Sequence, residues 1–383
     1  MRALSVRLSW SAPSTATQRW AVNRPLIRGD HRALERDLGQ LHLVLADPAA
    51  LSPSRGGRLG TGLRPGACVL DFGPMGVTRN LRTLGQGALA SVGSVLGELP
   101  TWNHYVAEPL DRRIAGPRVR PGTWEGYPFE FDLTDYTQRA AYYGGFERSE
   151  RRFIRAIARP GDVVVDVGAN VGLLTLAMAR AVGPGGRVIA VEPVPANARR
   201  LRENLSRGDI GRVDVVEAAI DDHDGLLHLG RSPESGDSSA TSGWWSARGS
   251  ASAEGERVTV PARTLEGILD ELHADAGDSA VRLVKIDTEG MEASVLKSMG
   301  PWLNPSRSRA LLMECVVHPE GLTAASCDTL DLTVAAGYRF GYLSATGHVR
   351  RLHEHTSDFR SSSLDWARAR TVGYSVFSLV AVR

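Results

Sequence analysis

The chain has 383 residues, of which 42% are hydrophobic and 23% charged, and its formal net charge is +2 at pH 7. This length suits one domain of about 250 residues with additional segments. So small a net charge argues against broad electrostatic attraction to nucleic acid. The chain has no stretch apolar enough to span a bilayer, so we expect no membrane association.

Cysteine usage indicates the compartment. Cys68, Cys315 and Cys327 show no Cys-x-x-Cys spacing, and three thiols cannot all pair within one chain. A reducing compartment is the simplest explanation. Arg7 and Trp10 interrupt the apolar core that a secretory signal peptide would need. The sequence therefore predicts a cytoplasmic protein.

The N-terminal part of the chain carries few structural signals. Residues 1–74 have scattered apolar positions and a Pro/Gly/Arg-rich run at 52–66. We expect them to be a disordered leader or a segment that precedes the true start. Residues 75–128 are expected to form helices and an extended segment covering the main domain, which is predicted over residues 129–383.

The first strand of the main domain leads into a glycine-rich turn. Val163–Val167 is a β-branched run typical of a parallel strand buried on both faces. Gly168 and Gly172 follow, where a ligand and a helix must approach the backbone closely. A helix is predicted over 172–182 and a second strand over 187–191.

Glu192 closes this second strand. In a doubly wound sheet the carboxyl end of a strand faces the ligand crevice, and an acid there suits a ribose diol. A nicotinamide site would need Gly-x-Gly-x-x-Gly, whereas here Gly168 and Gly172 are separated by three residues, Asp166 precedes them, and Pro193 follows Glu192. This pattern resembles the class I methyltransferases that use S-adenosyl-L-methionine (SAM).

The resemblance assigns roles to the turn residues. A carboxylate at Asp166 would accept a hydrogen bond from the ammonium of SAM. Backbone N–H groups at Gly168 and Gly172 would approach the carboxylate of its methionine part. Asn170 belongs to the same Asp-x-Gly-Ala-Asn-x-Gly motif, and Glu192 would bind the ribose.

Strands and helices alternate along the rest of the domain, which predicts an α/β fold with a doubly wound, mostly parallel, seven-stranded sheet. Further strands are expected at 213–217, 281–286, 309–315, 338–343 and 374–381. Further helices are expected at 147–158, 195–206, 264–273, 290–299 and 322–336.

The most specific motif is Lys285-Ile-Asp287-Thr-Glu289-Gly-Met-Glu292, which follows a predicted strand. Together with the glycine turn, the Glu-Pro pair and a helix that opens at Thr264, it resembles the FkbM family of SAM-dependent methyltransferases. The resemblance covers roughly residues 125–345. Glu266 stands where the family usually has Asp, a mild change in a helix's first turn. Membership would imply SAM as cofactor and an antiparallel last strand.

Three residues are candidates for catalysis. Methyl transfer to a hydroxyl benefits from a base that removes its proton, and Asp287 follows the fourth predicted core strand, where the acceptor should lie. His318 follows the fifth and has an imidazole suited to neutral pH, although a loop histidine bonded to backbone is the alternative. Glu289 could position the acceptor. Asp287 could instead cap the following helix or contact SAM.

Metal binding is a less favoured alternative. Asp287, Glu289 and Glu314 could hold Mg²⁺ through hard oxygen ligands, but acids at strand ends are common without metal, and we predict none. His348, His353 and His355 lie in a charged, Ser-rich segment typical of a solvated surface.

The adenine of SAM should lie beyond the third strand. By resemblance to the family, backbone groups of Ala219 and the carboxylate of Asp221 would contact it. Two insertions, 231–256 and 348–373, interrupt the domain. Trp244 and Trp245 in the first insertion would either close over an acceptor or pack onto the body of the protein.

These features predict a SAM-dependent O-methyltransferase. By resemblance, its acceptor would be a glycosyl residue or a polyketide-type natural product, a small molecule rather than nucleic acid. An N-methyltransferase acting on an amine and a non-catalytic SAM-binding module remain as alternatives. The sequence does not indicate the oligomeric state.

Overall fold

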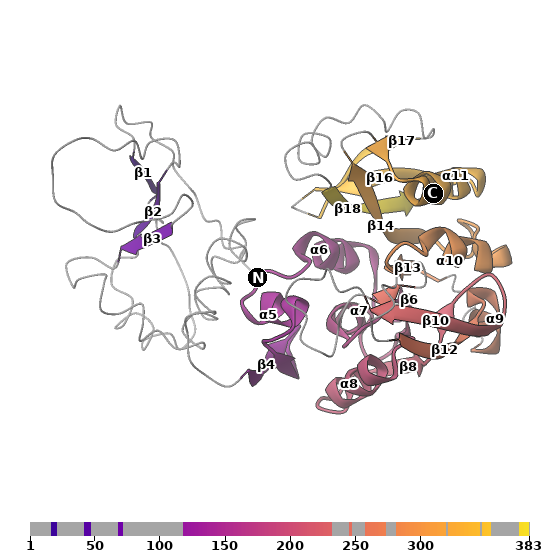
Figure 1. Ribbon diagram of the computed structural model, residues 1–383, viewed down its shortest axis with the longest axis horizontal. Coiled ribbons are helices and arrows are strands. Elements are labelled where there is room, and N and C mark those ends of the chain that lie inside the picture. Colours follow the sequence, from indigo (N-terminus) through magenta and orange to yellow (C-terminus); the bar gives the residue numbers. More distant parts are fainter. Residues whose placement is uncertain are drawn as a thin grey trace. The chain divides into compact units, whose positions relative to one another are not determined.

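The computed structural model describes residues 118–231, 257–272, 281–318, 321–344, 347–353 and 375–382, with short strands at 17–20, 42–46, 68–71 and 245–246 (Figure 1). The chain divides into two units. One comprises Met1–Pro117 and Tyr143–Gly145, and the other comprises Arg118–Tyr142 and Phe146–Arg383. In the first unit, β1 (Thr17–Trp20), β2 (His42–Ala46) and β3 (Cys68–Asp71) form an antiparallel sheet in that order.

A mostly parallel sheet forms the centre of the second unit. From one edge to the other, its strands are β8 (Arg212–Val216), β7 (Arg187–Val191), β6 (Val163–Val167), β13 (Leu283–Ile286), β14 (Ala310–His318), β18 (Ser375–Val382), β16 (Arg339–Leu343) and β17 (Val349–His353). Strands β8, β7, β6, β13 and β14 are parallel. Strand β18 is antiparallel to both of its neighbours, β14 and β16, and the short β15 (Gly321–Leu322) pairs with β14. The last strand of the chain is therefore inserted beside the fifth strand of the core.

The order of the parallel strands reverses beside β6. The chain first adds β7 and β8 on one side of β6 and later adds β13 and β14 on the other. The segments that leave β6 and β13 consequently lie next to each other at the carboxyl edge of the sheet, where the Asp287 N–H donates to the Val167 carbonyl oxygen at 3.1 Å. Ligands of open α/β sheets bind at such a switch point.

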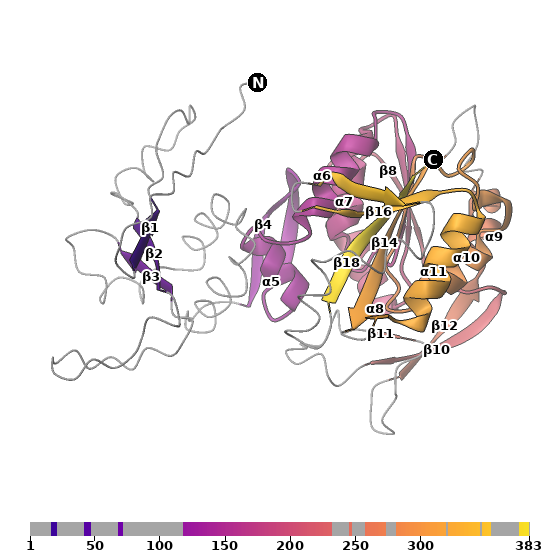
Figure 2. The same ribbon diagram turned by 90° about the horizontal axis from the view of Figure 1, so that it is seen from above.

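Helices cover both faces of this sheet, as Figure 2 shows for α6 and α7 on one side and α10 and α11 on the other. The helices of the first face are α6 (Arg148–Ile157), α7 (Leu173–Val182) and α8 (Pro195–Leu205), and those of the second are α9 (Leu265–Glu271), α10 (Glu292–Ser298) and α11 (Ala324–Ala335). Each face has its own apolar core, because alternate residues of a strand point to opposite faces. Thus Val164 and Leu283 pack beneath α6 and α7, whereas Val165 and Val284 pack against α9 and α10.

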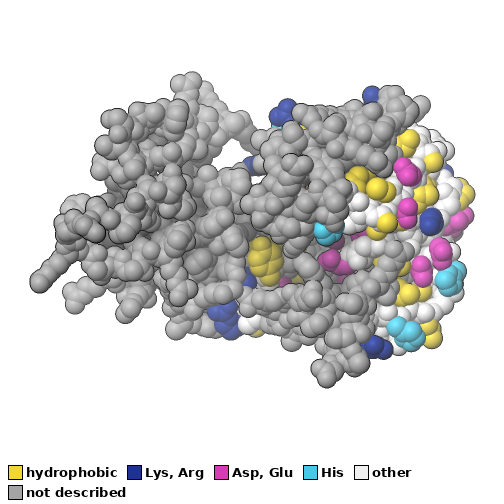
Figure 3. All heavy atoms as spheres, turned by 45° about the horizontal axis from the view of Figure 1, so that its top comes forward, with side chains coloured by type: hydrophobic (Ala, Val, Ile, Leu, Met, Phe, Trp, Pro, Cys, Tyr) yellow, Lys and Arg dark blue, Asp and Glu magenta, His cyan; other side chains and the backbone are white. Residues whose placement is uncertain are grey.

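None of the helices in the described part of the chain combines the length and the apolar character needed to cross a bilayer. On the face drawn in Figure 3, the described acidic, basic and histidine side chains are interspersed with apolar ones. This mixing agrees with the small net charge of the chain.

A hairpin precedes the sheet and attaches to the start of α7. Strand β4 (Val119–Trp124) pairs with β5 (Tyr127–Asp132), and α5 (Tyr136–Tyr142) follows. The Trp124 Nε1–H donates to the Leu173 carbonyl oxygen at 2.7 Å. The guanidinium of Arg151 lies 4.1 Å from the centre of the Trp124 ring, and the hairpin residue Glu125 pairs with Arg151 and Arg155. The hairpin therefore supports the helix that follows the glycine turn.

A second, smaller sheet lies beyond β8. Its strands are β11 (Trp245–Ser246), β10 (Gly225–Arg231), β12 (Arg257–Arg263) and β9 (Ala219–Ile220), in that order. It leads into α9, where Thr264 is the N-cap and its Oγ1 accepts a hydrogen bond from the Gly267 N–H at 3.2 Å. The predicted helix start at Thr264 is thereby confirmed.

The predicted α/β fold is confirmed, including the antiparallel last strand, but the sheet has nine strands rather than seven, because β15 and β17 also join it. Every predicted strand and helix of the core is present, with ends that differ by no more than three residues. The hairpin and β10 were not predicted. Pro121 and Gly122 obscure β4, because both residues are depleted in strands and Pro is tolerated only where its missing N–H is not needed.

Several predictions fall on segments whose structure is not described. These are residues 1–74 outside β1, β2 and β3, all of 75–117, most of the insertions 231–256 and 348–373, Trp244 and His355. The division into 1–74, 75–128 and 129–383 stays a prediction, and the second unit of the structure begins at Arg118.

Candidate functional site

The turn after β6 has a backbone that only glycine fits at Gly168. Its φ is +79°, and a Cβ added there would lie 1.9 Å from the Asp287 carbonyl oxygen. Gly172 also has a positive φ, and a Cβ there would lie 2.5 Å from Leu201 Cδ1. Asn170 lies between them in the left-handed region, which asparagine tolerates better than most residues. The turn thus packs against the segment after β13 and against α8.

Glu192 anchors this turn from the end of β7. Its Oε2 accepts a hydrogen bond from the Asn170 N–H at 2.8 Å, and its Oε1 accepts from the Val194 N–H at 3.0 Å. The Asn197 side-chain amide donates to the same Oε1 at 3.3 Å. Burial raises the pKa of the Glu192 carboxyl to about 7, because removal from water penalises the charged form more than these donors stabilise it.

Two buried acceptor atoms beside Glu192 fit a ligand that carries hydroxyl or amine donors. Asn170 Oδ1 and Asn197 Oδ1 are buried and have no hydrogen-bond partner among the described residues. A buried acceptor without a donor is costly, so a donor from a ligand would stabilise both. A ribose supplies such donors. Asn170, Asn197 and Glu192 therefore fit SAM.

Asp166 lies on β6, two residues before Gly168, and is fully buried. Its Oδ2 accepts a hydrogen bond from the Thr175 hydroxyl at 2.6 Å, and its Oδ1 lies 3.3 Å from Lys285 Nζ. The carboxylate thus has two partners within the protein. Its predicted contact with the ammonium of SAM stays a prediction.

Asp287 and Glu289 lie directly after β13 at the same edge. The side chain of Asp287 is 31% exposed, and its Oδ2 lies 3.4 Å from Lys285 Nζ. Glu289 has a φ of +54° in the tight turn that precedes α10. This turn is held by Glu292, whose Oε1 accepts hydrogen bonds from the N–H groups of Thr288 and Gly290, each at 3.1 Å. Asp287 is therefore the carboxylate of this segment that faces both the lysine and solvent.

Neighbouring acids respond to the charge of Asp287. Burial, with the charge of Asp287, raises the pKa of Glu289 to about 8. Burial and the same charge raise the pKa of Glu314, on β14, to about 9. Burial also raises the pKa of Glu147, which precedes α6, well above its usual range, with the charges of Glu150 and Asp287 adding to the effect. At neutral pH Glu289 and Glu314 therefore favour the protonated form, in which each can donate a hydrogen bond.

His318 ends β14, away from these carboxyls. Met313 pairs with Ile286, so Glu314 is level with Asp287, and His318 is four positions further along the strand. At about 3.3 Å per residue, this places His318 roughly 13 Å beyond Asp287 along the strand direction. The structure does not bring His318 and Asp287 together, and the role of His318 stays a prediction.

The predicted adenine contacts lie where the chain passes from β8 to the smaller sheet. Ala219 is buried and pairs in parallel with Ala262 of β12, and the Asp221 N–H donates to the Arg263 carbonyl oxygen at 3.1 Å. Part of this backbone thus forms its hydrogen bonds within the protein. The contacts of Ala219 and Asp221 with adenine stay predictions.

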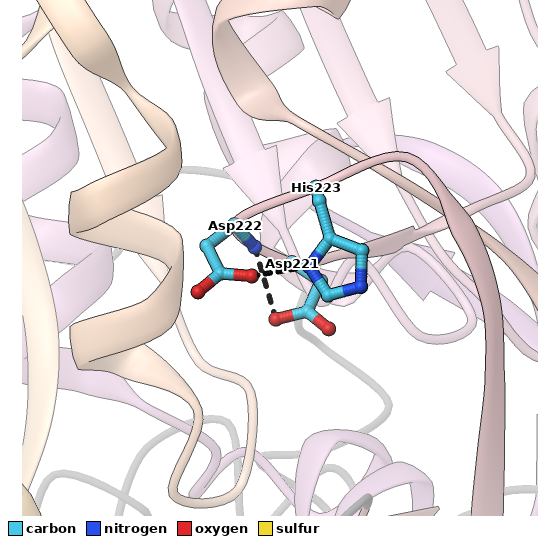
Figure 4. A group of neighbouring side chains, drawn as sticks. All are labelled: Asp221, Asp222 and His223. Carbon is cyan, nitrogen blue, oxygen red and sulfur yellow. Dashed lines mark hydrogen bonds and ion pairs between the residues drawn. The ribbon is translucent and has the colours of Figure 1, made fainter.

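Among the described residues, the only acidic and histidine side chains close enough to share a metal ion are Asp221, Asp222 and His223, within 4.8 Å of one another (Figure 4). His223 Nδ1 contacts Asp222 Oδ1 at 2.5 Å, and this hydrogen bond raises the pKa of the imidazole. Asp222 and His223 are exposed, so the group is a solvated surface feature. The triad considered for Mg²⁺, namely Asp287, Glu289 and Glu314, does not form such a group.

Two residues of the site received no role from the sequence. Lys285 is 5% exposed and contacts the glycine turn and two carboxylates. The sequence could have indicated Lys285, because the chain has only two lysines among its 45 lysine and arginine residues and one of them lies in the most specific motif. Glu147 gave no signal, since it is distant in the chain from the residues that it joins.

The last strand of the sheet is inserted antiparallel beside the fifth, and Glu192 accepts a hydrogen bond from the glycine turn. Both features are those of a class I SAM-dependent methyltransferase domain. Residues 166–340 match the profile of the Methyltransferase FkbM domain. This part of the chain is therefore an FkbM methyltransferase domain.

Two curated proteins have similar sequences. The 31-O-demethyl-FK506 methyltransferase FkbM of Streptomyces tacrolimicus is 34% identical over 164 residues, which cover 36% of this chain and 59% of that protein. The Protein-L-isoaspartate O-methyltransferase of Aeropyrum pernix is 45% identical over 64 residues, which cover 17% of this chain and 24% of that protein. The chain thus spans less than two thirds of the length of either relative.

Solved structures are more distant. An O-methyltransferase from Bacillus cereus in complex with SAH has a TM-score of 0.33 at 13% identity, over 61% of this chain and 81% of that one. A SAM-dependent methyltransferase described from Streptococcus mutans has a TM-score of 0.35 at 11% identity, over 70% and 56%. These scores are too low to establish a shared fold, and the fold assignment rests on the strand order.

Proposed function

We propose that the protein transfers the methyl group of SAM to a hydroxyl group of a small glycosyl or natural-product acceptor. The observation that carries this proposal is the contact between the two halves of the site. Gly168 belongs to the glycine turn, residues 168–172, which is the cofactor turn of the proposed site. It packs against the backbone of Asp287, whose carboxylate is partly exposed at the same edge of the sheet. The names of both curated relatives describe methyl transfer to oxygen, and the name 31-O-demethyl-FK506 methyltransferase supports a hydroxyl acceptor.

The residues of the crevice would hold the cofactor. Glu192, with Asn170 and Asn197 beside it, offers acceptors for the ribose. The N–H groups of Gly168 and Gly172 donate to the carbonyl oxygens of Val191 and Ala169, so both are already used within the protein. SAM supplies a methyl group bound to a positively charged sulfur, which reacts by in-line displacement. The protein then has to align the acceptor oxygen and receive its proton.

Asp287 is the residue we assign to receive that proton. It is ion-paired with Lys285 and partly exposed, so it stays available to an acceptor. Glu289 and Glu314, with pKa values raised to about 8 and about 9, would be protonated at neutral pH and could donate hydrogen bonds to acceptor oxygens. A base and neighbouring donors at one edge suit a polyhydroxylated acceptor.

The test compares Asp287→Asn with the wild-type chain. Calorimetry measures binding of SAM, and transfer of radiolabelled methyl is measured on panels of polyhydroxylated and amine acceptors. We expect Asp287→Asn to bind SAM within a few-fold of the wild type and to lose about 10²-fold or more in the rate of transfer to hydroxyls. Asp328→Asn, an exposed change on α11, is the matched control.

Each alternative predicts a different result. Transfer to amines that exceeds transfer to hydroxyls and survives Asp287→Asn would refute the O-methyltransferase and identify an N-methyltransferase. SAM binding without transfer to any acceptor would support the non-catalytic module. A folded chain that does not bind SAM would refute all three.

A further inference from the structure

One of the two lysines of the chain is buried at the switch point of the sheet. Lys297 is exposed on α10, whereas Lys285 is 5% exposed on β13. The chain uses arginine for its other 43 basic residues. A lysine at this position therefore indicates that the site needs a compact ammonium rather than the larger, planar guanidinium of arginine.

The ammonium of Lys285 joins three separate pieces of the site. Its Nζ donates to the Gly168 carbonyl oxygen at 3.0 Å. It lies 3.3 Å from Asp166 Oδ1 and 3.4 Å from Asp287 Oδ2. An ammonium has three N–H donors, so one donor is available for each of these oxygens. The three partners come from the end of β6, the glycine turn and the segment after β13.

We propose that Lys285 is a positioning residue that couples the cofactor turn to the acceptor side of the site. This inference rests on the proposed function, because it assigns the coupling to a reaction between those two sides. Lys285 holds the Gly168 carbonyl and the Asp287 carboxylate at a fixed separation. Lys285 therefore connects the turn to the Asp287 carboxylate, in addition to the backbone contact between Gly168 and Asp287.

The electrostatic surroundings support this role. The acidic groups that interact with the charge of Lys285 come from five places in the fold: Asp166 on β6, Glu192 after β7, Asp287 and Glu289 after β13, Glu314 on β14, and Glu147 before α6. Burial opposes the charged form of Lys285, but the charges of Asp287 and Asp166 raise its pKa above the usual value. The lysine thus stays charged in the pH range in which Glu289 and Glu314 titrate.

A direct test uses the scarcity of lysine. In a full-length Lys297→Arg protein, ¹⁵N-lysine labelling leaves Lys285 as the only lysine that contributes signals. We expect saturation with S-adenosylhomocysteine to shift these signals, and Asp287→Asn in the same background to shift the Nζ signal. Unchanged Lys285 signals at saturation would refute the coupling, whatever the activity.

Two substitutions separate positioning from structural support. Lys285→Met removes a charge that lowers the pKa values of Glu289 and Glu314, so the basic limb of the pH profile of kcat should move to higher pH. Lys285→Arg keeps the charge but not the geometry, so the limb should stay while kcat falls about tenfold or more. If Lys285 has only a structural role, both variants should lose stability while the acidic and basic limbs of the pH profile of kcat stay where they are in the wild type. That result would refute the proposal.

Two further measurements distinguish a folding defect from a loss of coupling, and a loss of coupling from a failure of the proposed function. Lys285→Met leaves Asp166 buried without its ion-pair partner, so the double variant Asp166→Asn, Lys285→Met removes both charges if the single variant does not fold. We expect its dissociation constant for S-adenosylhomocysteine to rise about tenfold, as for a lost hydrogen bond to a charged group. Wild-type affinity in this variant would refute the coupling. Shifted Lys285 signals without methyl transfer would support the coupling and refute the proposed function alone.

Discussion

Replacement of Gly168 by alanine tests the close approach between the cofactor turn and Asp287. A Cβ at this position would lie 1.9 Å from the Asp287 carbonyl oxygen. Non-bonded heavy atoms sit about 3.5 Å apart, so the turn or the segment after β13 must move by about 1.5 Å. The positive φ adds about 1 kcal/mol of strain, and overpacking adds about 1–3 kcal/mol. We expect the free energy of unfolding to fall by about 2–4 kcal/mol in total.

Gly161→Ala is the matched control. Gly161 has a similar φ of +91°, but no heavy atom lies within 4 Å of the position its Cβ would take. It should therefore lose only the strain of about 1 kcal/mol. Urea unfolding gives both free energies, and calorimetry should show SAM affinity reduced about tenfold or more for Gly168→Ala alone. Equal stability and equal SAM affinity of the two variants would refute the close approach as the reason for glycine at 168.

Three further changes have distinct expected results. Trp124→Phe should lower the free energy of unfolding by about 1–3 kcal/mol in urea, because the Leu173 carbonyl loses its donor. Thr264→Ala should lower it by about 1 kcal/mol through loss of the cap on the Gly267 N–H. Glu192→Gln should flatten the pH dependence of stability between 4.5 and about 7, the interval over which burial raises the pKa of Glu192. In that interval folded Glu192 keeps a proton that the unfolded chain releases, so wild-type stability falls as pH rises, which urea unfolding at a series of pH values measures.

Each of these has a control. Thr323→Ala removes the equivalent cap of α11 and should cost a similar amount, so a neutral Thr264→Ala beside a costly Thr323→Ala would contradict the role of Thr264. Glu203→Gln, exposed on α8, should leave the pH profile unchanged. Superimposable profiles of Glu192→Gln and the wild type would show that burial does not raise this pKa. Full stability of Trp124→Phe would show that its hydrogen bond is not stabilising.

The cofactor side of the site was predictable because its residues are close together in sequence. Gly168 and Gly172 lie within one turn, and a buried apolar run directly precedes them. Glu192 follows the next strand, and parallel neighbouring strands bring their carboxyl ends to one edge. Local pattern and a single pairing rule were therefore sufficient to predict that these residues share a site.

The acceptor side was less predictable because its residues come from elements far apart in the chain. Asp287 and Glu289 were found through a specific motif, but their relation to Glu147 and Glu314 depends on how α6 and β14 pack beside β13. The raised pKa values of Glu289 and Glu314 arise from burial, which a linear pattern does not express. His318 has the chemistry of a base, yet the length of β14 carries it past the level of Asp287.

Hydrophobic periodicity and glycine placement by themselves determined the order and type of the core elements, because burial on two faces of a sheet requires such patterns in any sequence that forms them. Only the tertiary structure decided that Lys285 bonds the Gly168 carbonyl and lies between Asp166 and Asp287. That arrangement depends on β13 pairing with β6 across more than a hundred residues of chain, in a register that places Lys285 opposite Asp166. Strand register is set by the packing of whole faces, and so the charges that control the site are settled by the fold rather than by any local motif.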